Sequence, residues 1–158
     1  MIRSHFTPVL LISVLLLSIA GHAAAAELIS PDPALAPEEV VAIQLEALKH
    51  NDDPTPNTGI AQTFALAHPN NRRITGPLPR FELMIRSPAY RALLGHSAHQ
   101  IERLTGNDMI VRFRVVVETP NGDAVKYLWE VGRVRDGPDK DAWLTTNVSV
   151  PLDAGQAL

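Results

Sequence analysis

The hydrophobic pattern changes its period near His96, and this change restricts the possible folds more than any other feature of the sequence. Before it, apolar residues recur every three or four positions, which predicts helices. After it, apolar and polar residues alternate, which predicts strands. Because helices that precede a run of antiparallel strands are typical of α+β domains, we expect N-terminal helices packed on a curved four-stranded antiparallel meander. This single α+β domain is expected to cover residues 37–152.

Helical segments are expected throughout the first part of the chain. Pro37 suits the first turn of a helix, and Glu38 and Glu39 behind it suit the positive end of the helix dipole. Gln44 flanks the apolar stripe of this helix. The expected elements are a helix over 37–50, a proline-containing loop over 51–57, a helix that ends before Pro69, a polar turn over 68–73, a helix over 77–86 and a short helical turn before Gly95.

Four strands are expected after residue 96, at about 98–104, 109–119, 124–135 and 142–150. Asn121-Gly122 predicts a tight two-residue hairpin between the second and third strands, because both central residues of that turn need a positive φ. Alternation gives the sheet one apolar face and one mixed face. The apolar face is expected to hold Val111, Phe113, Val115, Val117, Val125, Tyr127, Trp129 and Val131.

The first 26 residues have the pattern of a secretory signal peptide. Arg3 precedes an apolar run from Val9 to Ala20, and the small residues Ala23 to Ala26 offer a cleavage site. The run is too short for a stable membrane-spanning helix, and the chain has no cysteine for a lipid anchor. We therefore expect a periplasmic or secreted protein with a signal peptide over 1–26, an extended lead-in over 27–36 and a tail over 153–158.

Composition argues against several classes of function. The chain has 14 basic and 17 acidic residues, a net charge of −3, which does not suit a surface for nucleic acid or an anionic membrane. It has no cysteine, so thiol catalysis, thiolate metal sites and disulfide bonds are all excluded. We expect no cofactor, and the lack of any specific catalytic motif favours a non-catalytic role over an enzymatic one.

Aromatic side chains form the candidate binding site. If the sheet bends over the helices, the aromatic residues of its apolar face would line a cavity for a small apolar or amphipathic ligand or a protein partner. Packing in a solid core is an alternative interpretation, because large aromatic residues dominate ordinary cores. The expected ligand-binding residues are Tyr90, His96, Phe113, Tyr127 and Trp129.

Histidines offer two other kinds of chemistry. As an alternative function, His96 could act as the base of a small lyase or isomerase, with Glu82 as the nearby carboxylate. His96 and His99, with Glu102 or His68, could also bind a metal ion. However, a spacing of three residues on a strand or loop does not force two imidazoles toward one ion, and we expect no metal site.

The mixed face of the sheet is a candidate interface. Arg112 and Arg114 on the second strand, with Lys126 and Glu130 on the third, could form an ionic patch around Leu128. A charged and partly apolar surface of this kind suits a symmetric homodimer, which makes a structural dimerisation module the third hypothesis. A solvated sheet face is the other interpretation.

A set of short motifs resembles an uncharacterised family of exported bacterial and plastid proteins, the domain of unknown function numbered 4864. Asn71-Arg72 followed by Thr75-Gly76-Pro77 is the most specific part of this resemblance, which covers nearly the whole region after the signal pattern. Ala142 departs from it, because many relatives carry a cysteine there. Further matches are Pro37 to Val41, Gln44-Leu45, Ala47-Leu48, Gly59-Ile60, Thr63-Phe64, Phe81, Met84, Pro88, Tyr90, Leu93-Leu94, His96, Tyr127, Trp129, Trp143 and Thr145.

The order of the expected elements is similar to that of the nuclear transport factor 2-like (cystatin-like) superfamily, whose members pack helices into a curved antiparallel sheet. This resemblance implies a cone-shaped fold. It implies no particular activity, because the superfamily includes isomerases, dehydratases, ligand binders and dimerisation modules.

Overall fold

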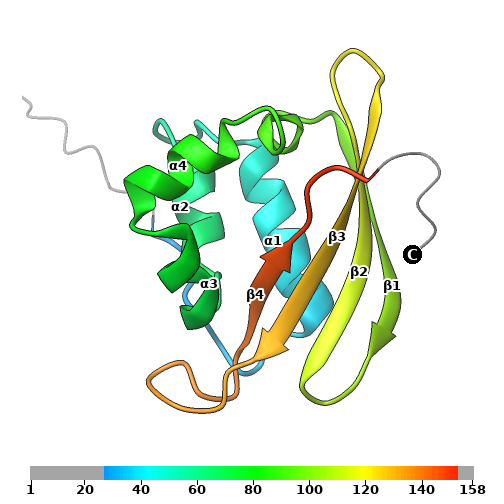
Figure 1. The fold of residues 1–158 in the computed structure, drawn as a ribbon. Coiled ribbons are helices and arrows are strands. Elements are labelled where there is room, and N and C mark those ends of the chain that lie inside the picture. The colour runs from blue at the N-terminus through cyan, green and yellow to red at the C-terminus, as the bar shows by residue number, and fades with distance from the viewer. Residues whose placement is uncertain (1–26, 153–158) are drawn as a thin grey trace, which may run out of the picture.

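The computed structural model describes residues 27–152, in which four α-helices and a short 3-10 helix precede a four-stranded antiparallel sheet (Figure 1). The expected α+β class is therefore confirmed. The expected signal peptide and tail lie outside the described residues. The elements are α1 (Pro37–Lys49), α2 (Thr58–Ala65), α3 (Pro69–Thr75), α4 (Leu78–Ile85), η1 (Arg91–Leu93), β1 (Ala98–Gly106), β2 (Ile110–Glu118), β3 (Ala124–Arg133) and β4 (Trp143–Val148).

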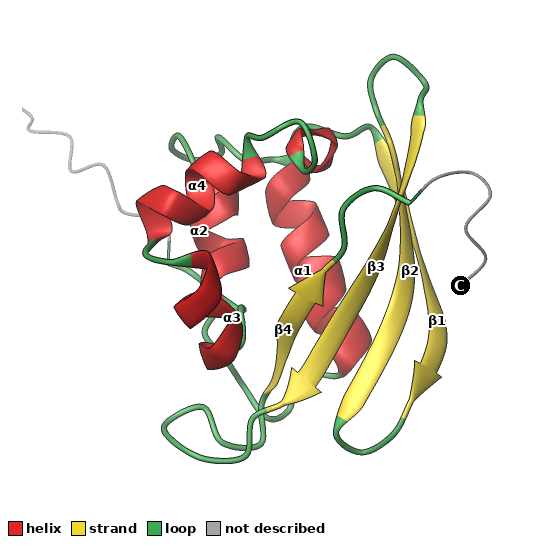
Figure 2. Ribbon diagram, viewed as in Figure 1, coloured by secondary structure: helices red, strands yellow, loops and turns green. Residues whose placement is uncertain are grey.

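The helices cover one face of the sheet and leave the other face without a helix from the described chain (Figure 2). The strands follow one another in the order β1-β2-β3-β4, as a meander requires. Helix α1 contacts β1, β3 and β4, whereas α2 packs on α1, and α4 packs on α2. The helix α3 contacts both α4 and β4. Helices α3 and α4 thus lie on the β4 side of the sheet, where both contribute to the wall of the cavity described below.

The core lies between α1 and the apolar face of the sheet, as the alternating pattern predicts. The interior residues of β2 and β3 have almost no exposed surface, and α1 supplies aliphatic side chains from one stripe. Full burial of a side chain of this size contributes about 1.5–3 kcal/mol. These core residues are Val41, Leu45, Leu48, Val111, Phe113, Val115, Val117, Tyr127, Trp129 and Val131.

Two acidic residues in the first turn hold α1 in place. The carboxylate of Glu39 accepts a hydrogen bond from the backbone N–H of Ala36 at 2.7 Å, which satisfies a donor that the helix start would otherwise leave unpaired. The carboxylate of Glu38 accepts from the guanidinium of Arg103 at 2.9 Å, and so joins α1 to β1.

The polar segment 68–73 is largely helical, so the prediction of a turn from its composition is wrong. Pro69 has the fixed φ that suits the first helical position, and the side chain of His68 accepts from the N–H of Asn70 at 3.1 Å. The helix α3 that results places Asn71 and Thr75, four residues apart, on one face. These two residues belong to the site described below.

The hairpin between β2 and β3 also differs from its prediction. A two-residue turn at Asn121-Gly122 would need the N–H of residue 120 to donate to Asp123, but Pro120 has no N–H. Instead, the N–H of Thr119 donates to the carbonyl of Asp123 at 2.9 Å. The loop has three residues, and Gly122, with φ +87°, takes the left-handed conformation that such a loop requires.

Candidate functional site

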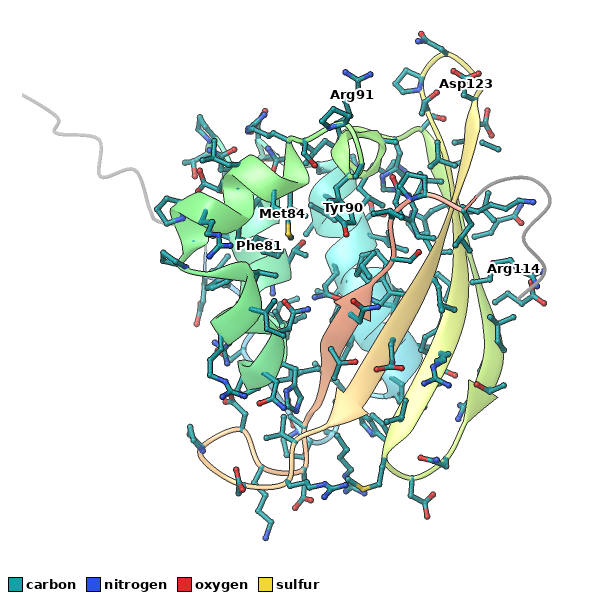
Figure 3. All side chains as sticks on the ribbon, in the orientation of Figure 1. Phe81, Met84, Tyr90, Arg91, Arg114 and Asp123 are labelled. Atoms are coloured by element: carbon teal, nitrogen blue, oxygen red, sulfur yellow. The ribbon has the colours of Figure 1, made fainter. Side chains whose placement is uncertain are left out.

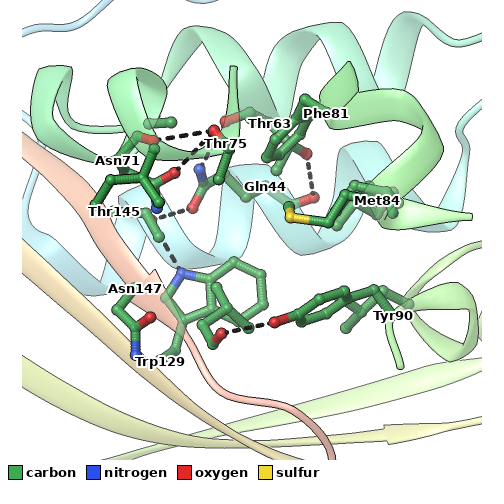
Figure 4. Close-up of a pocket in the computed structure, with 16 residues that line it drawn as sticks. Gln44, Thr63, Asn71, Thr75, Phe81, Met84, Tyr90, Trp129, Thr145 and Asn147 are labelled. Carbon is green, nitrogen blue, oxygen red and sulfur yellow. Dashed lines mark hydrogen bonds between the residues drawn. The ribbon is translucent and has the colours of Figure 1, made fainter. Parts of the chain in front are cut away.

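A cavity of about 220 Å³ lies between the helices and the β4 side of the sheet (Figure 4). In Figure 3, Phe81, Met84 and Tyr90 point into this region, whereas Arg114 lies on the helix-free face. No Asp, Glu, Lys, Arg or His from the described part of the chain lines the cavity. Its apolar lining includes Leu48, Phe81, Met84, Ile85, Leu93 and Val148, and its polar lining includes Gln44, Thr63, Asn71, Thr75, Thr145 and Asn147.

A β-bulge in β4 brings both Thr145 and Val148 to the cavity wall, to which Asn147 of the same strand also contributes. Val131 pairs with Thr145 and Trp129 pairs with Val148, so Thr146 is an extra residue in β4. In a regular strand, Thr145 and Val148 would face opposite sides, because they are three residues apart. The extra residue brings both to the cavity side.

A chain of hydrogen bonds connects the polar side chains of the cavity wall. The indole N–H of Trp129 donates to the hydroxyl of Thr145 at 2.9 Å, and this hydroxyl donates to Oε1 of Gln44 at 2.5 Å. The amide nitrogen of Gln44 donates to the carbonyl of Thr63 at 2.9 Å. Because indole can only donate, the direction of every bond in this chain is fixed. Each of these buried groups has a partner, as stable burial requires.

Polar residues of α3 form a second group on the wall. The amide nitrogen of Asn71 donates to the carbonyl of Thr146 at 3.0 Å, which ties α3 to β4. The hydroxyl of Thr75 lies 3.0 Å from the carbonyl of Asn71 and 3.3 Å from its side-chain oxygen. Asn147, at the exposed edge of the cavity, adds another amide.

Tyr90, which lines the cavity, stacks on Tyr127 of the core. The rings of Tyr90 and Tyr127 lie 6.4 Å apart at an interplanar angle of 18°. The hydroxyl of Tyr90 donates to the carbonyl of Val148 at 3.2 Å, and that of Tyr127 donates to the carbonyl of Ala89 at 3.1 Å. Burial raises the pKa of Tyr127 to about 12, with a smaller effect from Tyr90, and burial also raises the pKa of Tyr90. Both rings are therefore neutral near pH 7.

The five expected ligand-binding residues do not all meet at the cavity. Tyr90 and Trp129 line it. Phe113 and Tyr127 are fully buried in the core beside it, and His96 is buried near η1 and β1. The alternating pattern identifies the inner face of the sheet, but it does not say which part of that face borders an open space.

His96 is held by two hydrogen bonds and is only 1% exposed. Its Nδ1 lies 2.8 Å from the carbonyl of Leu93, and its Nε2 lies 2.9 Å from Nδ1 of His99. Since a carbonyl only accepts, Nδ1 of His96 carries the proton, and Nε2 of the neutral ring accepts from His99. Both ring nitrogens are thus occupied. Glu82 accepts from the amide of Asn57 at 3.4 Å instead of contacting His96.

The other candidate metal ligands have separate roles. Glu102 pairs with Arg114 at 2.8 Å, and His68 caps α3. Within residues 27–152, no three His, Asp or Glu side chains are arranged to hold a metal ion.

We expect the protein to lose stability as the pH falls below about 6.5. Burial lowers the pKa of His96, and His99 and Lys49 nearby lower it further, while the carbonyl of Leu93 partly opposes them. The unfolded chain then binds a proton that the folded chain does not, so the free energy of unfolding rises with pH in this range. One such histidine contributes at most about 1.4 kcal/mol per pH unit to the slope of the free energy of unfolding against pH. The pKa of His68 is also lowered, so His68 changes the stability in the same direction.

Urea-induced unfolding at about pH 7.5 and about pH 5 measures this effect. The His96→Gln variant should lose less stability between the two conditions than the unchanged protein does. An equal loss in both proteins would assign the pH dependence to other groups.

The ionic patch expected on the mixed face is present in part, and it includes Glu102 of β1, which was not expected in it. Arg112 pairs with Glu130 and Arg114 pairs with Glu102, both at 2.8 Å, and each pair lies directly across neighbouring strands. Exposed pairs of this kind contribute about 0.2–1 kcal/mol each. Leu128 lies half-buried on the same face. Dimerisation through this face stays a prediction.

Sequence reasoning missed most of the polar lining. Gln44 gave a weak signal, because it lies within an otherwise apolar helix face. Asn71 and Thr75 belong to the most specific part of the family resemblance, but a polar turn would not align them. Thr145 is among the further matches of that resemblance, but alternation along the strand does not place it at the cavity, since its position depends on the bulge at Thr146.

No family model, curated protein or solved structure matches the chain. In the described part of the chain, every helix is too short or too polar to cross a membrane. The fold and the cavity are therefore the basis for the functional proposal.

Proposed function

We propose that this protein is a non-catalytic binding module that holds a small, largely apolar molecule in the cavity between its helices and its sheet. The observation that carries the proposal is the composition of the wall, which combines apolar side chains with a few fixed polar groups, as small-molecule sites do. An apolar cavity of about 150 Å³ is enough to bind benzene. At about 220 Å³, this cavity suits a single ring or a short branched chain.

The proposal includes the place of action and the fold family. The signal pattern over residues 1–26 supports export to the periplasm or the medium. The order of helices followed by a meander, with a cavity between the two layers, supports a nuclear transport factor 2-like cone. The resemblance to the uncharacterised exported family agrees with both.

Fluorescence of Trp129 tests the binding proposal. The chain has two tryptophans, so a Trp143→Phe variant leaves Trp129, which lines the cavity, as the single reporter. Toluene is the probe, because it is apolar and small enough for the site. We expect a saturable change in emission and a rise in the unfolding temperature with probe concentration.

A pair of variants controls for binding elsewhere. Ala67 lines the cavity, and Ala67→Leu in the Trp143→Phe background should abolish the response by filling it. Ala65 lies outside this lining, so Ala65→Leu introduces the same side chain without filling the cavity. A response that is unsaturable, or that survives Ala67→Leu, would contradict the proposal.

The two other hypotheses have different support. A lyase or isomerase with His96 as the base is disfavoured, because both of its ring nitrogens already have partners. Dimerisation has one favourable observation, since Ile110 is 38% exposed on the same face as the ionic patch. Light scattering at high protein concentration tests this second candidate, and a monomer mass would exclude it.

A further inference from the structure

The side chain of Gln44 has a hydrogen-bond donor left to offer at the cavity. Its Oε1 accepts the proton of Thr145, whose own oxygen accepts from Trp129. Its amide nitrogen has two protons, and the bond to the carbonyl of Thr63 at 2.9 Å uses one of them. Because Trp129 fixes the direction of the chain, the amide cannot turn over and present its oxygen instead.

Asn71 is oriented in a similar way. The backbone carbonyl of Thr146 can only accept, so the amide nitrogen of Asn71 must face it, at 3.0 Å. The side-chain oxygen then lies on the side of Thr75, whose hydroxyl approaches it at 3.3 Å. One amide proton of Asn71 is therefore left as well, and Asn71, like Gln44, lines the cavity.

The cavity offers no charge to a charged ligand. Its lining holds no acidic or basic side chain from the described residues, and its one phenol, Tyr90, is neutral near pH 7. An ion that entered the cavity would lose hydration without gaining a counter-charge, which is unfavourable. A neutral acceptor suits the amide donors of Gln44 and Asn71 without that penalty.

We infer that the ligand is a small neutral carbonyl compound, of the ketone, ester or lactone type, whose oxygen accepts a hydrogen bond from Gln44. This inference rests on the proposed binding function and names the class of molecule bound. A carbonyl oxygen has two lone pairs, so the same atom suits Asn71 as a second donor. The apolar body of the ligand packs against Trp129, Phe81 and Met84, which border the same cavity (Figure 4).

Two probes of equal shape test the inference on the unchanged protein. Cyclohexanone carries an acceptor oxygen, and methylenecyclohexane has a CH₂ group in its place. We expect cyclohexanone to bind about tenfold more tightly in calorimetric or NMR titrations, because the hydrocarbon leaves the amide donor unpaired. The side-chain NH₂ signals of Gln44 should shift with cyclohexanone and not with methylenecyclohexane.

The outcomes separate this inference from the binding proposal. If neither probe binds, the binding proposal itself fails. If both bind equally and the Gln44 signals do not move, or if cyclohexylammonium binds as tightly as cyclohexanone, binding stands and the carbonyl class is wrong. A Gln44→Met variant should lose the preference for cyclohexanone and still bind methylenecyclohexane. Should that variant fail to fold, the two probes on the unchanged protein still decide the question.

Discussion

Replacement of Gly59 by alanine is expected to destabilise the protein by about 3 kcal/mol. A Cβ atom on Gly59 would lie 1.9 Å from the carbonyl oxygen of Ala47 and 2.6 Å from its carbonyl carbon. These are backbone atoms of α1, so no side-chain rotation relieves the overlap. The N–H of Gly59 also donates to the carbonyl of Asn51 at 2.9 Å, which holds α2 against the end of α1. In the variant, α1 and α2 must therefore move apart. Because both helices contribute residues to the cavity wall, the cavity changes as well.

Gly122→Ala is the matched control. Urea-induced unfolding measures the free energy of unfolding of both variants. Gly122 has φ +87°, and a Cβ atom there would meet nothing within 4 Å beyond its chain neighbours. Alanine at this position therefore suffers only from the left-handed backbone, at about 1–2 kcal/mol. Gly59→Ala should be clearly less stable than Gly122→Ala. Equal stability of the two variants would mean that α1 and α2 do not lie as close together as they do in the structure.

Truncation of Trp129 to alanine is expected to cost about 3–5 kcal/mol of the free energy of unfolding. The side chain is 1% exposed, and it occupies the middle of the core next to the cavity. Its loss also leaves the hydroxyl of Thr145 without the indole donor. Since domains of this kind are stable by about 5–15 kcal/mol, the variant should be close to unfolding at ordinary temperatures.

Trp143→Ala provides the comparison, because Trp143 is only partly buried at the start of β4. It removes the same number of atoms from a site that water already reaches. The difference between the two tryptophan variants, measured by thermal and urea-induced unfolding, should be at least about 1.5 kcal/mol. Equal losses would show that Trp129 is not the better-packed residue.

Local patterns predicted the strands and the first helix well. Val115 and Trp129 lie on the inner face because successive strand residues point in opposite directions, a property of the backbone alone. The start of α1 at Pro37 follows from proline's fixed φ and from the acidic residues behind it. In each case, the deciding interaction spans only a few residues.

Other elements depended on neighbours far along the chain. The segment 68–73 is polar, and its composition favours a turn. Its helix has a local cap from His68 and also a hydrogen bond from Asn71 to Thr146, 75 residues away, which short-range patterns do not show.

The hairpin at Asn121-Gly122 is a local case that could have been predicted correctly, because the missing N–H of Pro120 is visible in the sequence.

The site shows the same division between local and distant causes. The sequence by itself determined the α+β class, the two faces of the sheet and the absence of thiol chemistry, because periodicity and composition are properties of short segments and residue counts. Only the tertiary structure decided that Trp129 borders a cavity whereas Phe113, on the same face, does not. It also decided which way the amide of Gln44 points, through a bond to Thr145, 101 residues away. A cavity is the space that packed elements leave unfilled, and its position depends on how distant segments meet.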